Sequence, residues 1–343
     1  MIKYSLKCEI LSPLHIGTGE GIEPFYYIIK EHKFYKISLD NFLFELPSDD
    51  RTAFERLIDE GRLNKIRKFI GEKVNVGAYS IYSTDVTPEV EEIYNSKLDD
   101  IQNQLLINPF VRTAGRNRPY VPGSSIKGAI RTALINQIAQ NSNLPKPQNY
   151  REEFEFESKV LGCTDAKNDP FRGIKIRDGI LPSDSTIITK VKNVTKDRSG
   201  NLSPNNIQLI CEITYSMISK RPVVFEVELI FDDNLFSTNY LSGDFIIEDI
   251  KEACNGFYLD KLQAEHDKFY KNSIISSSSM ALLNEEIEDN AFLLRIGRFS
   301  GVESVTIDNY RNPRPPGKGI WGKSRNLAEM KYPMGWIKIE ISQ

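Results

Sequence analysis

The sequence predicts an α+β fold, in which strands and helices are interspersed irregularly. Two strand-like segments stand near the ends of the chain: Tyr4–Ile10 alternates polar and apolar residues, and residues 336–341 repeat large apolar residues at strand spacing. Several segments with helical spacing lie between them. No periodic series of strands and crossover helices is present, which disfavours a doubly wound parallel sheet.

The elements expected in the first half follow from hydrophobic spacing and from breakers. Pro13, Gly17 and Gly19 mark a loop after the first strand. Pro88 stands at the start of a helix with an acidic first turn. We expect strands at 25–29 and 33–37, and helices at 38–44, at 54–70 with an interruption at Gly61, at 88–106 and at 124–138.

Dense β-branched and aromatic residues predict further strands in the second half. The segments 207–216 and 223–231 are joined by a short connection, which predicts a hairpin. The other expected elements are strands at 171–179, 185–194 and 336–341, a helix at 248–270 and a loop at 271–280.

The length and composition indicate a globular protein of two domains. Because a domain has about 150 residues, the 343 residues predict one unit at 1–160 and another at 161–343. Hydrophobic residues make up 40% and charged residues 27%, which excludes wholesale disorder. No apolar run reaches the roughly 18 residues of a membrane span, and the N-terminus lacks a signal peptide's apolar region. We therefore expect a cytoplasmic protein with no membrane partner.

The sequence predicts neither a metal site nor a cofactor. The four cysteines are far apart, no CxxC pair occurs and only three histidines are present, which disfavours structural zinc. We expect the cysteines to be buried, reduced thiols. Adjacent acids such as Asp49–Asp50 fit turns better than a metal-dependent nuclease, because neighbouring residues of a strand point to opposite faces.

Positive charge is concentrated in two segments, although the formal net charge of the chain is −3. Residues 101–150 contain no acid and six cations, and residues 310–331 contain six cations and the single acid Glu329. Basic segments rich in glycine and proline within an acidic chain are typical of a polyanion site. The alternative is that both segments are solvated surface loops.

The first motif is SPLHIGTGEG at 12–21. Its glycines Gly17 and Gly19 let a ligand approach the backbone closely. No lysine follows at P-loop spacing, so an NTPase is excluded. His15 either orders the loop through a hydrogen bond or acts as a general base in RNA cleavage.

The second motif is RPYVPGSSIKGAIRTAL at 118–134. A turn at Pro122-Gly123 precedes a helix that Ser124 or Ser125 is expected to cap. Free amides at a helix start favour an anion, and cations four residues apart share one helix face. The alternative is an ordinary capped helix with surface cations. The predicted phosphate contacts are Arg112, Arg116, Arg118, Gly123, Ser124, Ser125, Lys127 and Arg131.

The third motif is LLRIGRFSGVESVTI at 293–307, followed by WGKSR at 321–325. It predicts a flexible basic turn, and Trp321 beside two cations suits stacking and phosphate contact. The alternative is a plain connecting loop. The predicted RNA contacts in this region are Gly297, Arg298, Ser300, Gly301, Lys323 and Arg325, to which His15, Gly17 and Gly19 are added from the first motif.

These motifs, in this order, resemble the RAMP superfamily of CRISPR-associated proteins. YVPGSSIKGAIRTAL is the most specific of them, with SPLHIGTG before it and RIGRFSG after it. The resemblance implies ferredoxin-like (RRM-like) cores with helical and loop insertions. It also implies binding of CRISPR RNA within a ribonucleoprotein.

Within the superfamily, DPFRGIKIRD at 169–178 and KSRNLAEMKYPMGWIKIE are most similar to the family of fifth subunits of the type III-A effector, the Csm complex. That resemblance implies a non-catalytic subunit that caps the filament near the guide 3′ end, beside the repeated backbone subunit. It also implies support of guide maturation and antiviral defence, with host nucleases as further candidate partners.

Two other functions remain open at this point. One is a metal-independent endoribonuclease that processes CRISPR RNA with His15 as general base, and the other is a scaffold that mainly binds protein. RNA recognition is expected to be directed at the backbone, because guides vary in sequence while phosphates and 2′-hydroxyls do not.

Overall fold

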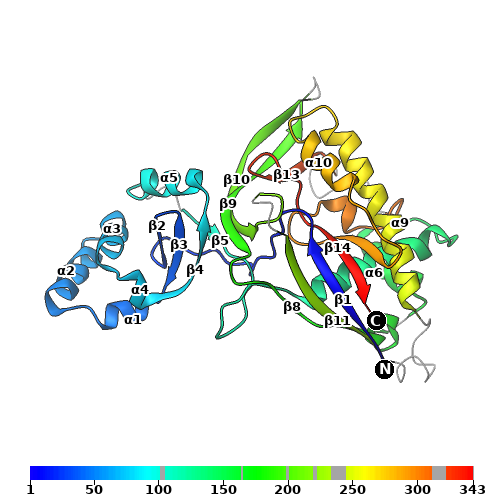
Figure 1. The fold of residues 1–343 in the computed structure, drawn as a ribbon, viewed down its shortest axis with the longest axis horizontal. Helices are drawn as coiled ribbons and strands as arrows, with labels where there is room; N and C mark the ends of the chain where they lie inside the picture. Colours follow the sequence, from blue (N-terminus) through cyan, green and yellow to red (C-terminus); the bar gives the residue numbers. More distant parts are fainter. Residues whose placement is uncertain are drawn as a thin grey trace.

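The computed structural model describes residues 1–100, 105–163, 165–197, 201–218, 222–232, 245–310 and 322–342. A core that contains both marked chain ends carries a lobe on one side (Figure 1). The lobe is formed by a segment inserted after the first strand, and it extends away from the two long helices of the core.

The core sheet has the strand order β12–β14–β1–β11–β7, with every neighbouring pair antiparallel. The chain order β1–α6–β7–β11–α9–β14 places the first strand between the last and the third, as in a ferredoxin-like fold. The predicted α+β class with a ferredoxin-like core is therefore confirmed. The elements are β1 (Ile2–Ile10), β7 (Ile174–Ile176), β11 (Val223–Phe231), β12 (Ala291–Arg295), β14 (Trp336–Ser342), α6 (Gly123–Gln140) and α9 (Ile247–Glu265).

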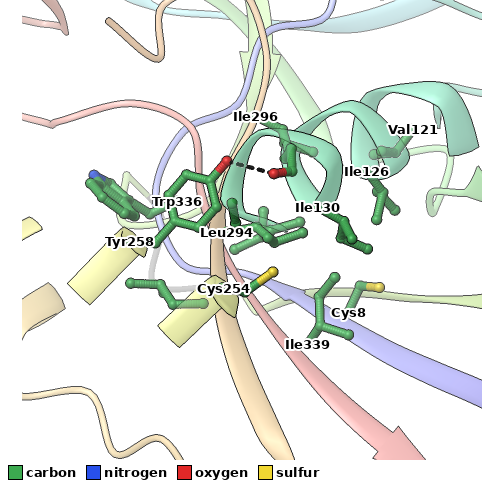
Figure 2. Close-up of a cluster of buried hydrophobic side chains, with 14 of the residues drawn as sticks. Cys8, Val121, Ile126, Ile130, Cys254, Tyr258, Leu294, Ile296, Trp336 and Ile339 are labelled. Carbon is green, nitrogen blue, oxygen red and sulfur yellow. Dashed lines mark hydrogen bonds between the residues drawn. The ribbon is translucent and has the colours of Figure 1, made fainter. Parts of the chain in front are cut away.

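The hydrophobic core lies between this sheet and the helices α6 and α9 (Figure 2). Alternation in β1 turns Cys8 inward with its apolar neighbours, and an apolar stripe on α6 that includes Ile130 faces it. The Tyr258 hydroxyl of α9 donates to the Ala129 carbonyl oxygen of α6 at 3.0 Å, so the buried ring keeps a polar partner. All four cysteines are buried and free, as predicted.

Among the described residues, the lobe consists of a three-stranded extension and five helices. Gly61 separates two of the helices, as predicted. The predicted helix 88–106 is shorter in the structure: it ends at Lys97, and Leu105, with φ 49°, no longer has right-handed helical geometry. The elements are β2 (Tyr27–Lys30), β3 (Lys33–Ile37), β4 (Ser80–Val86), α1 (Leu39–Phe44), α2 (Ser48–Asp59), α3 (Leu63–Lys73), α4 (Val76–Tyr79) and α5 (Pro88–Lys97).

A second large sheet joins the lobe to the core in the order β2–β3–β4–β9–β10–β5, with β13 paired to β9. Strands from before and after residue 160 share both large sheets, and the domain boundary at that residue stays a prediction. A small sheet pairs β6 with β8. The added elements are β5 (Ile107–Asn108), β6 (Tyr120–Val121), β8 (Gly179–Ile180), β9 (Thr186–Lys196), β10 (Leu202–Thr214) and β13 (Ser324–Ala328).

Two expectations about the second half are wrong. β10 pairs with β9 and β11 pairs with β1, so the segments predicted as a hairpin lie in different sheets. The predicted loop 271–280 is also wrong in its second half, where the serines 276–279 begin a helix. The remaining elements are α7 (Tyr150–Val160), α10 (Ser276–Leu283), the short helices η1 (Ala166–Asn168), η2 (Pro170–Gly173) and η4 (Val302–Ser304), and the π-helical turn η3 (His266–Tyr270).

Among the described helices, none combines the length and the apolar composition that a membrane crossing needs.

Candidate nucleic-acid interface

The three motifs meet at one open hollow of about 680 Å³, which we call the glycine groove. The first motif, helix α6 and the loop after β12 each form one wall. This convergence brings together segments almost 300 residues apart in the sequence. The groove is lined by Ile16, Gly17, Gly19, Gly21, Leu106, Asn108, Ser124, Ser125, Gly128, Ala129, Thr132, Arg295, Ile296, Gly297, Arg298, Ser300, Ser304 and Val305.

The first wall is formed by residues 17–22, which face alternately the glycine groove and a second hollow. Isolated bridges tie its ends, Gly17 and Ile22, to residues 107–110. Gly17, Gly19 and Gly21 line the glycine groove, whereas residues 18, 20 and 22 line another hollow. The groove side of this wall is therefore bare backbone at Gly17 and Gly19, which a phosphate or sugar can approach closely, whereas the Leu106 side chain packs on Gly21.

His15 lies beneath this wall and is 1% exposed. Its Nδ1–H donates to the Glu212 carbonyl oxygen at 2.7 Å, and its ring stacks on Phe299 with centroids 5.6 Å apart. Burial lowers the pKa of the imidazole, which favours the neutral form. A Cβ at Gly17 would come within 2.9 Å of His15 Nε2. The histidine thus packs the wall from below, and its role as a general base stays a prediction.

The loop of the third motif is fixed to the first. The Arg298 N–H donates to the His15 carbonyl oxygen at 3.0 Å, and Ser300 Oγ donates to the Gly297 carbonyl oxygen at 3.0 Å. Gly297 has φ 89°, and a Cβ there would lie 2.7 Å from the His15 oxygen. The Arg298 side chain is exposed at the groove and donates to Asn108 Oδ1 at 3.1 Å.

The start of α6 differs from its prediction. The helix begins at Gly123 after Pro122, without a side-chain cap from Ser124 or Ser125. The Gly123 N–H donates to Asp178 Oδ1 at 2.8 Å, and the Ser125 N–H donates to the Pro122 carbonyl oxygen at 2.9 Å. A carboxylate and a carbonyl thus already satisfy two of the amides at this helix start, and the anion site there stays a prediction.

The groove face of α6 carries small and hydroxyl residues instead of cations. Ser124, Ser125, Gly128 and Thr132 line it. A Cβ at Gly128 would meet nothing within 4 Å, so the glycine leaves open space. The analysis of the motifs missed Gly128 and Thr132. A signal was present, since a glycine inside a helix costs about 1 kcal/mol relative to alanine and requires a reason.

Lys127 and Arg131 point to a different side of α6. Arg131 pairs with Asp169 at 2.8 Å and with Glu157 at 3.2 Å, and its guanidinium lies over the ring of Phe171. Burial lowers the pKa of the half-buried Lys127. Neither residue lines the glycine groove. The phosphate contacts predicted for this helix therefore lie on two different sides of it: Ser124 and Ser125 line the groove, whereas Lys127 and Arg131 do not.

The arginines before α6 also have protein partners. Arg112 is buried against Tyr82 and pairs with the buried carboxylate of Glu212. Arg118 donates to the Leu181 carbonyl oxygen at 2.9 Å. Arg116 is exposed on the turn between them. Of these three predicted contacts, only Arg116 presents an exposed cation.

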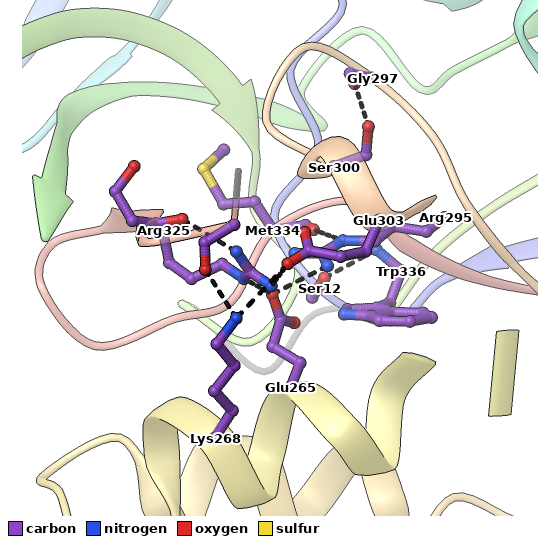
Figure 3. Close-up of polar contacts among 12 residues, drawn as sticks. Ser12, Glu265, Lys268, Arg295, Gly297, Ser300, Glu303, Arg325, Met334 and Trp336 are labelled. Carbon is purple, nitrogen blue, oxygen red and sulfur yellow. Dashed lines mark hydrogen bonds and ion pairs between the residues drawn. The ribbon is translucent and has the colours of Figure 1, made fainter. Parts of the chain in front are cut away.

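Arg325 belongs to a buried network behind the loop of the third motif (Figure 3). It is 5% exposed and pairs with Glu265 and, at 3.0 Å, with Glu303. Glu265 also pairs with Arg295 at 2.9 Å. The guanidinium of Arg325 is thus neutralised within the protein, and the network braces the loop that carries Arg298.

Lys323 and Gly301 line an adjoining hollow of about 530 Å³, which shares Gly297, Arg298 and Ser300 with the glycine groove. Lys323 is exposed there. Trp321 and the cations Arg311, Arg314 and Lys318 lie outside the described residues. Within the described ranges, no group of three or more His, Cys, Asp or Glu residues is placed to hold a metal ion.

The ferredoxin-like core, with the glycine loops of the first and third motifs beside the first core helix, agrees with the fold that the RAMP resemblance implies. The chain belongs to the RAMP superfamily, whose family model matches residues 7–279.

Comparison with named proteins shows which members of the superfamily this chain is similar to. The chain is 28% identical over 331 residues to "CRISPR system Cms protein Csm5" of Methanocaldococcus jannaschii, covering 89% of this chain and 73% of that protein. It is 30% identical over 150 residues to the protein of the same name from Streptococcus thermophilus, covering 41% of this chain and 40% of that protein.

Two solved structures have a similar fold. The first is a chain of the cryo-EM structure of the Csm-crRNA-target RNA ternary complex in the type III-A CRISPR-Cas system, with TM-score 0.70, 19% identity, and 98% of this chain and 100% of that chain covered. The second is the crystal structure of T. onnurineus Csm5, with TM-score 0.62, 19% identity, and 96% and 99% covered.

Proposed function

We propose that this chain is the Csm5-type subunit of a type III-A effector complex and that its glycine groove binds the backbone of CRISPR RNA. The observation that carries the proposal is the convergence of the three motifs on one groove. Its relatives named Csm5 and its fold neighbour from a Csm-crRNA-target RNA complex support the same function.

The chemistry of the groove suits a nucleic-acid backbone. Glycines expose main chain on one wall, hydroxyls of Ser124, Ser125 and Thr132 line the second, and Arg298 supplies an exposed cation on the third. Hydroxyls, amides and arginine are common donors to phosphate and sugar oxygens, and such contacts carry no sequence information. A subunit that holds guides of differing sequence needs this kind of contact.

The finer parts of the proposal come from the resemblance. The subunit caps the filament near the guide 3′ end, next to the repeated RAMP backbone subunit, and it supports guide maturation and antiviral defence in the cytoplasm without catalysing cleavage itself. Host nucleases are candidate partners in maturation. The buried, hydrogen-bonded His15 supports a structural role for this residue.

Copurification with RNA tests the proposal. The tagged chain, expressed with the rest of its complex, is expected to retain CRISPR RNA, which sequencing identifies. For the isolated chain, binding to a single strand through about four phosphates predicts a slope near −3 in log affinity against log salt, at roughly 0.7 per phosphate. Absence of RNA from the complex, or a flat salt titration, would contradict it. A scaffold predicts entry into the complex without RNA binding by the chain alone.

A further inference from the structure

A second hollow, of about 660 Å³, lies on the other side of the wall formed by residues 17–22. We call it the tyrosine hollow. Its lining includes Thr18, Glu20, Tyr26, Lys36 and Asn117. It shares Gly21 with the glycine groove, so the two hollows are neighbours separated by a single stretch of backbone.

The wall offers little obstruction between the two spaces. The residues that face the glycine groove from it are Gly17, Gly19 and Gly21, which have no side chains. A nucleotide whose phosphate lies in the groove therefore meets main chain at Gly17 and Gly19, whereas the Leu106 side chain packs on Gly21. The base of this nucleotide is the part that is able to turn across the wall, because the sugar–phosphate chain stays in the groove.

Tyr26 supplies a stacking platform in the tyrosine hollow. It is 45% exposed, and its ring contacts no other aromatic ring or cation among the described residues. Its N–H donates to the Glu23 carbonyl oxygen at 3.0 Å, and its carbonyl accepts from the Ile37 N–H at 2.9 Å, so its backbone is fixed. Tyr82, in contrast, is covered by the Arg112 guanidinium, 3.9 Å from its ring centroid.

The charges around Tyr26 favour a base over a phosphate. Glu20 and Glu23 are exposed at this hollow and form no ion pair among the described residues. Carboxylates repel phosphate but accept hydrogen bonds from the amino groups of bases. Lys36 and Asn117 also line the hollow and add donors.

We propose that the tyrosine hollow receives one nucleobase of the RNA strand held in the glycine groove and that this base stacks on Tyr26. The proposal rests on the proposed function and adds to it a site for a base. Unstacked bases of single-stranded RNA are commonly bound on aromatic side chains.

The experiment combines Tyr26 variants with RNA from which single bases have been removed. Tyr26→Ala is expected to weaken RNA binding by the full-length chain about 5- to 100-fold, the loss typical of one base–aromatic stack. Tyr26→Phe keeps the ring and should stay within about twofold of wild type. Phe44→Ala removes an aromatic ring that is 82% exposed in the lobe, away from both hollows, and should leave binding unchanged.

An abasic scan identifies the base. At one nucleotide position, base removal should weaken wild-type binding as much as Tyr26→Ala does and should weaken the Tyr26→Ala variant no further. Unchanged binding by a folded Tyr26→Ala variant, or losses that add independently at every position, would overturn the base site. A wild-type chain that binds no RNA overturns the proposed function itself, which is a different result.

Discussion

Helix α6 has two polar faces that differ in what their side chains already bind. The groove face carries Ser124, Gly128 and Thr132, which form no ion pair and leave open space. The other face carries Lys127 and Arg131, and Arg131 is held by two carboxylates. A run of positive charge in the sequence therefore does not identify free positive charge, and the open space on this helix lies instead at Gly128.

Blocking the groove face should have the largest effect. Gly128→Leu places a large side chain where a Cβ meets open space, so it should displace RNA from the groove and remove two or more charge-assisted contacts. Binding should fall roughly 100-fold, at about 1.5 kcal/mol per contact. The helix should become more stable, because leucine is the better helix former.

The matched control for that variant is Gly256→Leu in α9. Gly256 is also an exposed helical glycine with nothing within 4 Å of a Cβ, and it lies outside the groove. Equilibrium binding and thermal melting of both variants separate occlusion from folding. Equal binding by the two variants would contradict the assignment of the groove face.

Removing the exposed cation of the groove should have a smaller effect. Arg298→Ala deletes one phosphate contact, so we expect about tenfold weaker binding and a salt slope reduced by roughly 0.7. Arg151→Ala in α7, where the side chain is 88% exposed, is the control. A salt slope identical to that of wild type would show that Arg298 touches no phosphate.

The Lys127→Ala/Arg131→Ala double variant tests the other face directly. The pairing of Arg131 predicts a loss of about 1 kcal/mol in the free energy of unfolding, from two partly exposed ion pairs and a cation–π contact. RNA binding should change less than about threefold, which is under 1 kcal/mol. Denaturant unfolding and filter binding measure the two quantities. A tenfold loss of binding would show that Lys127 and Arg131 also contact RNA, and the two faces would then not differ in this respect.

The smallest effect concerns the packing beneath the wall. Burial lowers the folded-state pKa of His15, so as pH falls below about 6.5 the unfolded chain binds a proton first and the free energy of unfolding decreases. His15→Phe removes that proton and should make stability less dependent on pH between about 7 and 5.5. If the free energy of unfolding of wild type and of His15→Phe depends on pH in the same way, His15 is protonated in the folded protein over this range.

The fold was predictable where its signals are local. The alternation of β1 and the apolar stripe of α6 depend only on neighbours in the sequence, and the structure confirms both. The partners of β10 and β11 are not local, because Cys211 pairs with Thr189 in one sheet and Phe225 pairs with Cys8 in another. Two successive apolar strands with a short connection favour a hairpin, and no local signal in the sequence shows that the two strands belong to different sheets.

The sequence predicted which glycines line the candidate site, but it did not predict which cations are free to contact a ligand. Gly17, Gly19 and Gly297 do line one groove. Asp169, one of the two acids that pair with Arg131, is 38 residues away, and Glu212, which pairs with Arg112, is 100 residues away. Only the folded chain shows that these cations are already paired.

The pairing of β1 with β14 has a consequence for synthesis on the ribosome. The register joins Ile10 to Ile337, so 327 residues must be added before this pair exists. At about 5–20 residues per second, the first strand waits roughly 15 to 65 s for its partner. During that time β1 has an unpaired edge, which is a template for wrong association. The core sheet is therefore completed only after β14 has left the exit tunnel.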